Sequence, residues 1–127
     1  MPPEKYPFPH DPERSEYRLF PAELEDDEHV FFHGTAACNL GPILDNGFSI
    51  PIEPPSVSFA KNSALALGYA SAKRTPASPD GCVLAVRYEK LDRPGLKVEV
   101  SMLHDYTCNP QPEIIGYCIV PASYRHV

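Results

Sequence analysis

The stretch that decides the fold is residues 31–48, FFHGTAACNLGPILDNGF. Two aromatic residues run into His33, and Gly34 and Thr35 follow at once. The apolar run 29–33 predicts a strand that ends at Gly34. A histidine at a strand end can hold its ring at the edge of a cleft, and a glycine beside it lets a ligand approach the backbone. A lone histidine in such a place is also typical of a structural residue.

The second half of the same stretch predicts a short helix. Leu40, Ile43 and Leu44 have the i, i+3, i+4 spacing of one helical face. Asn46 and Gly47 supply the C-terminal stop of that helix.

Outside this stretch the chain alternates short strands with one further helix. The expected strands are residues 16–20, 56–60, 81–88, 95–100 and 113–120, and the expected helix is residues 62–74. This pattern predicts an α+β fold dominated by strands, in a single domain over residues 16–127. Several of the sixteen prolines lie near the N-terminus, so we expect residues 1–15 to form a flexible leader.

Length and hydropathy limit the class of protein. A chain of 127 residues suits one domain with a real core. No apolar run approaches the roughly 20 residues of a membrane span, and the first residues lack the apolar segment of a secretory signal. We therefore expect no membrane contact and a cytoplasmic location, or delivery into the cytosol of a target cell by a route that needs no signal.

Charge is unevenly distributed along the chain. Residues 1–28 hold nine acids and three bases, a net charge of −6, and the other 99 residues hold eight of each. Because a nucleic-acid surface needs a basic face, this distribution disfavours broad nucleic-acid contacts. The densest acidic run, residues 23–28, is typical of a solvated loop, and a docking segment for a basic partner is the alternative.

The spacing of the four cysteines does not indicate a metal site. Cys38, Cys82, Cys108 and Cys118 are scattered, without a pair at zinc-ligand spacing. Cys82 and Cys118 lie in strand-like apolar runs, which predicts buried, reduced packing residues. We expect no bound metal.

Two further groups of residues are candidates for chemistry. Ser58 and Phe59 end an expected strand, and Tyr69 follows on the expected helix, where its ring could offer a flat surface to an aromatic ligand. A core position is the ordinary alternative for such a tyrosine. Glu113 leads into a buried strand and is preceded by Gln111; a carboxylate there is costly unless it is hydrogen-bonded or functional.

Taken in order, these groups resemble the ADP-ribosyltransferase superfamily. The similarity is to its poly(ADP-ribose) polymerase-like and diphtheria-toxin-like branch, the His-Tyr-Glu type, and covers about residues 29–120. The matching segments are FFHGTAACNLGPILDNGFSIPIEPPS, SFAKNSALALGYA and PEIIGY. The resemblance implies a compact α+β fold of two packed, mainly antiparallel sheets with short helices around an NAD cleft.

The resemblance also implies roles for individual residues, with NAD as the co-substrate. His33 would bind a ribose hydroxyl, the Gly34 backbone the carboxamide, and Tyr69 the face of the nicotinamide ring. Glu113 would bind the 2′-hydroxyl of the nicotinamide ribose and stabilise the positive charge that develops at C1′. The catalytic set implied is Glu113, His33 and Tyr69, and the NAD-binding set is His33, Gly34, Thr35, Ser58, Phe59 and Tyr69.

Two departures from the family pattern matter. Ser58 stands where the His-Tyr-Glu set has a tyrosine, so Phe59 would have to help hold the ring or one wall is missing. Gln111 and Glu113 resemble a Gln-x-Glu pair, in which the glutamine assists the acceptor.

The activity implied is transfer of ADP-ribose from NAD to a macromolecule, with release of nicotinamide. A small mono-ADP-ribosylating enzyme of toxin or effector type is expected, with a protein acceptor favoured over nucleic acid. NAD hydrolysis, tRNA 2′-phosphotransfer and a catalytically inactive module that binds NAD or ADP-ribose are the alternatives.

Overall fold

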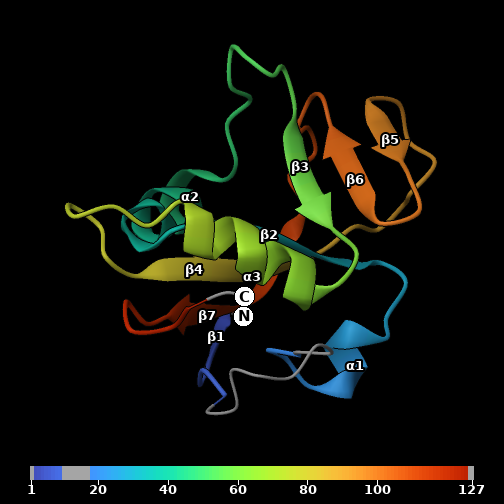
Figure 1. Ribbon diagram of the computed structural model, residues 1–127. Helices are drawn as coiled ribbons and strands as arrows, with labels where there is room; N and C mark the ends of the chain where they lie inside the picture. Colours follow the sequence, from blue (N-terminus) through green and yellow to red (C-terminus); the bar gives the residue numbers. More distant parts are fainter. Residues whose placement is uncertain (1, 10–17, 126–127) are drawn as a thin grey trace.

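The computed structural model describes residues 2–9 and 18–125 and has an α+β fold built on one open seven-stranded sheet (Figure 1). The strand order is β1-β7-β4-β2-β3-β6-β5. The strands are β1 (Glu4–Tyr6), β2 (Val30–Ala36), β3 (Val57–Ala60), β4 (Gly81–Arg87), β5 (Leu96–Val98), β6 (Met102–Asp105) and β7 (Glu113–Val120). The helices are α1 (Ala22–Glu25), the 3-10 helix η1 (Ala37–Asn39), α2 (Leu40–Asn46) and α3 (Ser63–Ala72).

The sheet diverges between β2 and β3. β2 pairs with β4 along its whole length, from Val30 to Ala36, whereas it meets β3 at the single pair Phe32–Ala60. β3 therefore carries β6 and β5 away from the other strands, as Figure 1 shows. The structure therefore has one open, mixed sheet of seven strands, and the two packed sheets implied by the resemblance are not found among the described residues.

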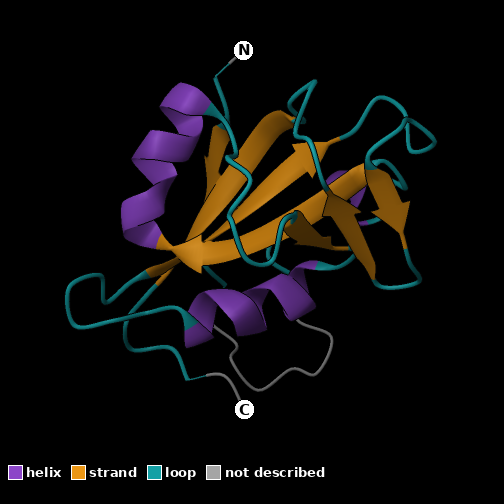
Figure 2. Cartoon of the chain, turned by 90° about the horizontal axis from the view of Figure 1, so that it is seen from above, coloured by secondary structure: helices purple, strands orange, loops and turns teal. Residues whose placement is uncertain are grey.

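Helices and loops cover the two faces of the sheet with separate apolar clusters. On one face α3 lies across the strands (Figure 2), with Ala66, Leu67 and Ala70 fully buried. On the other face Phe48 and residues of α2 pack against Phe31 and its neighbours. Alternate residues of the central strands supply the two clusters, which is the period-2 pattern of a sheet buried on both faces.

Gly34 lies inside β2 rather than at its end. The strand continues to Ala36, so the prediction of a strand ending at Gly34 is wrong. A Cβ atom on Gly34 would lie 2.1 Å from the backbone oxygen of Ala66 and 2.7 Å from the backbone nitrogen of Ala70. The glycine therefore lets the backbone of α3 pack directly on β2.

Most long elements agree with the sequence analysis. The expected helices become α2 and α3, and the strands expected at 56–60, 81–88 and 113–120 become β3, β4 and β7. The strand expected at 95–100 is shorter, and β6 was not expected. Residues 18–20 form no strand; the rest of the strand expected at 16–20 lies outside the described residues.

A short N-terminal strand joins the edge of the sheet. β1 pairs in parallel with β7, and the ring of Tyr6 packs edge-on against Phe20 at 5.3 Å. These residues belong to the segment expected to be a flexible leader. Residues 10–17 of that segment lie outside the described residues.

The acidic run is partly built into the core. Glu25, at the end of α1, is 7% exposed. Its carboxylate accepts hydrogen bonds from the backbone N–H of Phe20, at 3.2 Å, and from the hydroxyl of Ser63 at the start of α3. For Glu25 the expectation of a solvated loop is wrong, because this carboxylate ties α1 to α3.

The cysteines lie where the strand patterns predict them. Cys82 and Cys118 are free and buried in β4 and β7, and burial raises the pKa of each thiol to about 12. In the described part of the chain, no group of three or more metal-ligating side chains comes together. No helix among the described residues has the length and apolar character to cross a bilayer.

Candidate functional site

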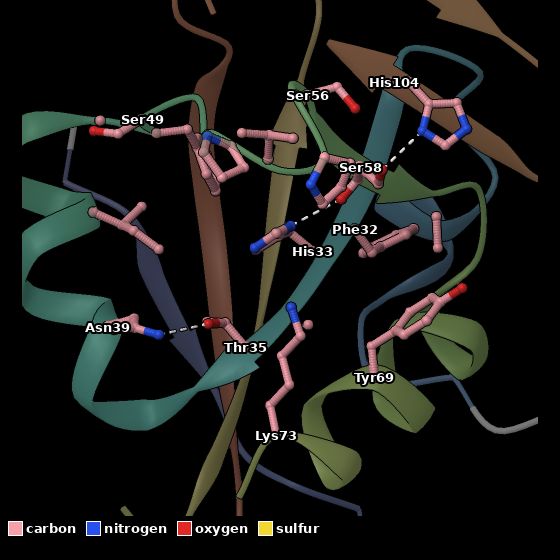
Figure 3. A pocket seen from close by; sticks show the side chains of 18 of the residues that line it. Phe32, His33, Thr35, Asn39, Ser49, Ser56, Ser58, Tyr69, Lys73 and His104 are labelled. Atoms are coloured by element: carbon pink, nitrogen blue, oxygen red, sulfur yellow. Dashed lines mark hydrogen bonds between the residues drawn. The ribbon is translucent and has the colours of Figure 1, made fainter. Parts of the chain in front are cut away.

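The main cavity lies where β3 diverges from β2. Its volume is about 730 Å³, within the usual range for a small-molecule site. Its walls come from β2, β3, β6, α2, α3 and the loop after α2 (Figure 3). The polar and charged side chains that line it include those of His33, Thr35, Asn39, Ser49, Ser56, Ser58, Tyr69, Lys73 and His104.

His33 presents a hydrogen-bond acceptor to this cavity. Its Nδ1 lies 2.9 Å from the backbone oxygen of Ser58, and because a carbonyl only accepts, Nδ1 carries the proton. Burial lowers the pKa of His33; the bond to Ser58 opposes this effect, and the charge of Lys73 adds to it. The ring is therefore neutral near pH 7, and Nε2 is free of a proton.

An aromatic cluster holds the His33 ring. The ring centroids of Phe48 and Phe59 lie 5.2 Å and 5.4 Å from that of His33. Phe59 is fully buried and is not part of the cavity wall. It therefore supports His33 from behind, and the expectation that Phe59 contacts NAD does not fit this position.

α3 contributes two side chains, one turn apart, to the cavity. Tyr69 in α3 and Lys73 at its C-cap are spaced i, i+4. The Lys73 ammonium extends toward His33, whereas the Tyr69 hydroxyl points away from it (Figure 3). Tyr69 is 47% exposed, so it is not the core residue that its apolar neighbours in the sequence favour. The side chain of Asn62 caps the start of this helix by accepting from the Leu65 N–H at 2.8 Å.

At the other end of the cavity, Thr35 and Asn39 form a polar pair. The Asn39 side-chain amide donates to the Thr35 hydroxyl oxygen at 2.9 Å. Thr35 is nearly buried, so this bond fixes the direction of its hydroxyl. The hydroxyl proton of Thr35 can still be donated to a ligand.

Ser58 belongs to a chain of three polar side chains. Ser58 on β3 and His104 on β6 face each other in register, and Ser58 Oγ lies 2.8 Å from His104 Nδ1. His104 Nε2 lies 3.0 Å from a carboxylate oxygen of Glu99, in the turn between β5 and β6. Figure 3 shows Ser58 and His104 together on the cavity wall beside His33.

Glu113 does not join this site. It pairs across β7 and β4 with Arg87, which in turn pairs with Val30, three residues before His33. Paired residues share a face and successive residues alternate, so Glu113 points to the face opposite His33. Three residues and two strand spacings separate the two Cα atoms by about 14 Å.

A second, smaller cavity contains Glu113. Its volume is about 440 Å³, and its lining includes Arg87, Lys90 and Arg93. Glu113 is exposed, and its carboxylate lies 4.0 Å from the Arg87 guanidinium. The structure thus brings together His33, Gly34, Thr35, Ser58 and Tyr69 of the predicted site, but leaves Glu113 and Phe59 outside the cavity.

The side-chain amide of Gln111 is engaged in a structural contact and is not available to a ligand. Its amide oxygen accepts from the Phe48 N–H at 2.8 Å, and its amide nitrogen donates to the Phe48 oxygen at 2.7 Å. Both ends of the amide are therefore used to tie the loop before β7 to the loop after α2. This arrangement does not fit the expected role of assisting an acceptor.

The charge of the main cavity favours an anionic ligand. Lys73 lines it, and none of its described lining residues is an aspartate or glutamate. A cation in a concave, partly apolar site attracts negative charge more strongly than the same cation on an open surface.

Among the polar lining residues named above, the sequence did not predict Asn39, Ser49, Ser56, Lys73 and His104. Lys73 is recognisable only once α3 is placed, because i, i+4 spacing from Tyr69 puts it on the same face. His104 lies in a strand too short to show an alternating pattern. Asn39 lies at a 3-10 turn, which gave no signal of its own.

Comparison of the sequence with protein-family models and with curated proteins gave no match. The geometry of the cavity, together with the motif resemblance, is therefore the basis for a functional assignment.

Proposed function

We propose that the main cavity binds NAD and that the protein transfers ADP-ribose from NAD to a macromolecular acceptor, releasing nicotinamide. One observation carries this proposal. Three segments that are far apart in the sequence and resemble NAD-binding motifs, at residues 33–35, 58 and 69, line one cavity.

The described side chains suit the parts of NAD. The unprotonated Nε2 of His33 would accept a hydrogen bond from a ribose hydroxyl. The half-exposed ring of Tyr69 would stack on the nicotinamide. Lys73 would face the negative pyrophosphate, a contact that the sequence analysis did not foresee.

The class of acceptor is proposed from the net charge of the chain. The neutral balance of residues 29–127 suits a protein acceptor better than a long nucleic acid. Mono-ADP-ribosylation by a toxin or effector-type enzyme, acting in a cytosol, is the form of activity that we propose.

A second candidate is a module that binds NAD or ADP-ribose without cleaving it. The observation that favours it is the absence of a carboxylate from the described lining of the cavity. In the family that the motifs resemble, a glutamate supplies that charge.

The test is incubation of the protein with NAD labelled in its adenine, with a cell lysate as the source of acceptors. Free nicotinamide and label on macromolecules are measured together. We expect both to rise. Nicotinamide without macromolecular label means that water is the acceptor, and bound but uncleaved NAD means that the protein is a binding module.

A matched pair of variants assigns the activity to the cavity. Tyr69→Ala removes the stacking surface, and we expect NAD affinity to fall about tenfold, the effect of losing about 1.4 kcal/mol. Tyr106→Ala is the control, since Tyr106 is similarly exposed, at 45%, but does not line the cavity. Equal affinities for the two variants would contradict the proposed site.

A further inference from the structure

Ser58, His104 and Glu99 form a chain of hydroxyl, imidazole and carboxylate that ends in the main cavity. We propose that Ser58 and His104 are the catalytic base of this cavity and that Glu99 is the residue that positions them. The inference rests on the proposed function, and it supplies a proton acceptor where Glu113 does not reach the site.

The positions of the protons follow from the chemistry of the partners. The Glu99 carboxylate lies 3.0 Å from His104 Nε2 and can only accept, so this pair favours the tautomer with the proton on Nε2. In the neutral ring Nδ1 is then an acceptor, and the Ser58 hydroxyl, at 2.8 Å, donates to it. This is the order of groups in a Ser-His-Asp triad, with the two ring nitrogens exchanged.

Each member of the chain is held by the backbone. Ser58 and His104 are register partners on adjacent strands, and the Ser58 carbonyl is fixed by His33 at 2.9 Å. Glu99 lies in the tight turn after β5, where its N–H donates to the Met102 oxygen at 2.8 Å. Such preorganisation is what a catalytic base requires.

Charged and titratable groups face His104 from two sides. On the outer side are Glu99 and Lys97, whose ammonium lies 4.0 Å from the Glu99 carboxylate. On the cavity side are His33 and Lys73. Among the described lining residues no carboxylate competes with His104 for the proton of a bound hydroxyl.

In the proposed step the hydroxyl proton of Ser58 passes to His104 Nδ1 while Ser58 Oγ takes the proton of the acceptor hydroxyl or water. The acceptor oxygen forms a bond to C1′ of the nicotinamide ribose. The bond from C1′ to the ring nitrogen breaks, and its electron pair leaves with neutral nicotinamide. The resulting imidazolium is stabilised by the Glu99 carboxylate.

The experiment compares variants that keep or remove the hydroxyl. For Ser58→Ala we expect nicotinamide release to fall about 100-fold or more in kcat, the usual effect of removing a general base, with little change in the Kd for NAD. Ser58→Thr retains the hydroxyl and is expected to keep most of the rate. His104→Gln is expected to behave as Ser58→Ala does.

Glu99 is tested by separating kcat from the Kd for NAD. Glu99→Gln keeps a polar side chain beside His104 but removes the charge that stabilises the imidazolium formed in the step, so it is expected to lower kcat with little change in the Kd for NAD. Glu89→Gln, which changes an exposed carboxylate beside the second cavity, is the control and is expected to leave both values unchanged.

The outcomes separate the two proposals. If the wild type releases nicotinamide and both Ser58→Ala and His104→Gln keep its rate, the base is wrongly assigned and the proposed function stands. If the variants bind NAD but lose the rate, and Ser58→Thr restores it, the assignment is supported. If the wild type releases no nicotinamide, the proposed transfer reaction and this base fail together.

Discussion

Gly34 lies where the backbone of α3 packs closely on β2. From the sequence, the glycine was expected to leave room for a ligand, whereas in the structure it leaves room for the backbone of α3. Both explanations of Gly34 depend on its lack of a Cβ atom. The position of α3 against β2 decides between them.

We therefore expect Gly34→Ala to lower the free energy of unfolding by about 1–3 kcal/mol, because the added methyl group meets backbone atoms that cannot turn aside. Urea unfolding measures the change. Gly41→Ala is the control, since a Cβ there meets nothing within 4 Å, and a better helix former in α2 is expected to stabilise slightly. Equal effects of the two variants would refute this explanation of Gly34.

The partly buried ring of His33 predicts that the stability of the fold depends on pH. Its folded-state pKa lies below the ordinary 6.5, so the unfolded chain binds more protons as the pH falls through 6.5. The free energy of unfolding is then expected to decrease below that pH, and not above it.

His33→Gln keeps an amide donor for the Ser58 oxygen and removes the titration. Its unfolding free energy should lose less between neutral and mildly acidic pH than that of the wild type. Denaturant unfolding at several pH values measures the difference. Identical slopes for the two proteins would show that His33 is not the group responsible.

The longer helices and strands were the easier ones to predict from the sequence. β4, β7 and α3 have enough apolar residues in a row to show their period, and they appear where expected. β1, β6 and α1 have three or four residues each, too few for a period. β1 forms because the edge of β7 offers it partners, a cause that no local pattern contains.

Gln111 joins the loop before β7 to the loop after α2, because its side-chain amide bonds to both backbone groups of Phe48 as a neighbouring strand would. Gln111→Ala leaves both backbone groups of Phe48 without this partner, and we expect a loss of about 1–3 kcal/mol in unfolding free energy. Because Phe48 packs on His33, NAD affinity should fall as well.

Gln111→Glu is the matched variant for this prediction. Its carboxylate can accept from the Phe48 N–H but cannot donate to the Phe48 oxygen, so it is expected to lose less than Gln111→Ala. Calorimetric Tm and NAD titration measure the two effects. If Gln111→Ala matched the wild type in both, the loop bridge would have no role in the site.

At the scale of the whole molecule, sheet register decides which predicted residues meet. The order of motifs correctly grouped His33, Ser58 and Tyr69, which lie on β2, β3 and α3 around the divergence of the sheet. Glu113 has the position in the sequence expected of a catalytic carboxylate, but β7 lies on the far side of β4 from the cavity. Sequence order gives no strand order, so this difference was not accessible from the chain alone.

Because Glu113 lies outside the main cavity, its catalytic role can be tested directly by substitution. Glu113→Gln removes a charge paired with Arg87 at 4.0 Å, on the opposite face from His33. We expect nicotinamide release to stay within about fivefold of the wild type, since Glu113 does not line the main cavity and an exposed ion pair contributes at most about 1 kcal/mol. A loss comparable to that of Ser58→Ala would return the catalytic role to Glu113.

The central claim is that one cavity, between β2, β3 and α3, holds NAD. The most direct measurement is a crystal structure of the protein with a non-hydrolysable NAD analogue. We expect the nicotinamide ring against Tyr69 and a ribose hydroxyl within hydrogen-bond distance of His33 Nε2. An analogue bound beside Glu113 in the second cavity, with the main cavity empty, would contradict it.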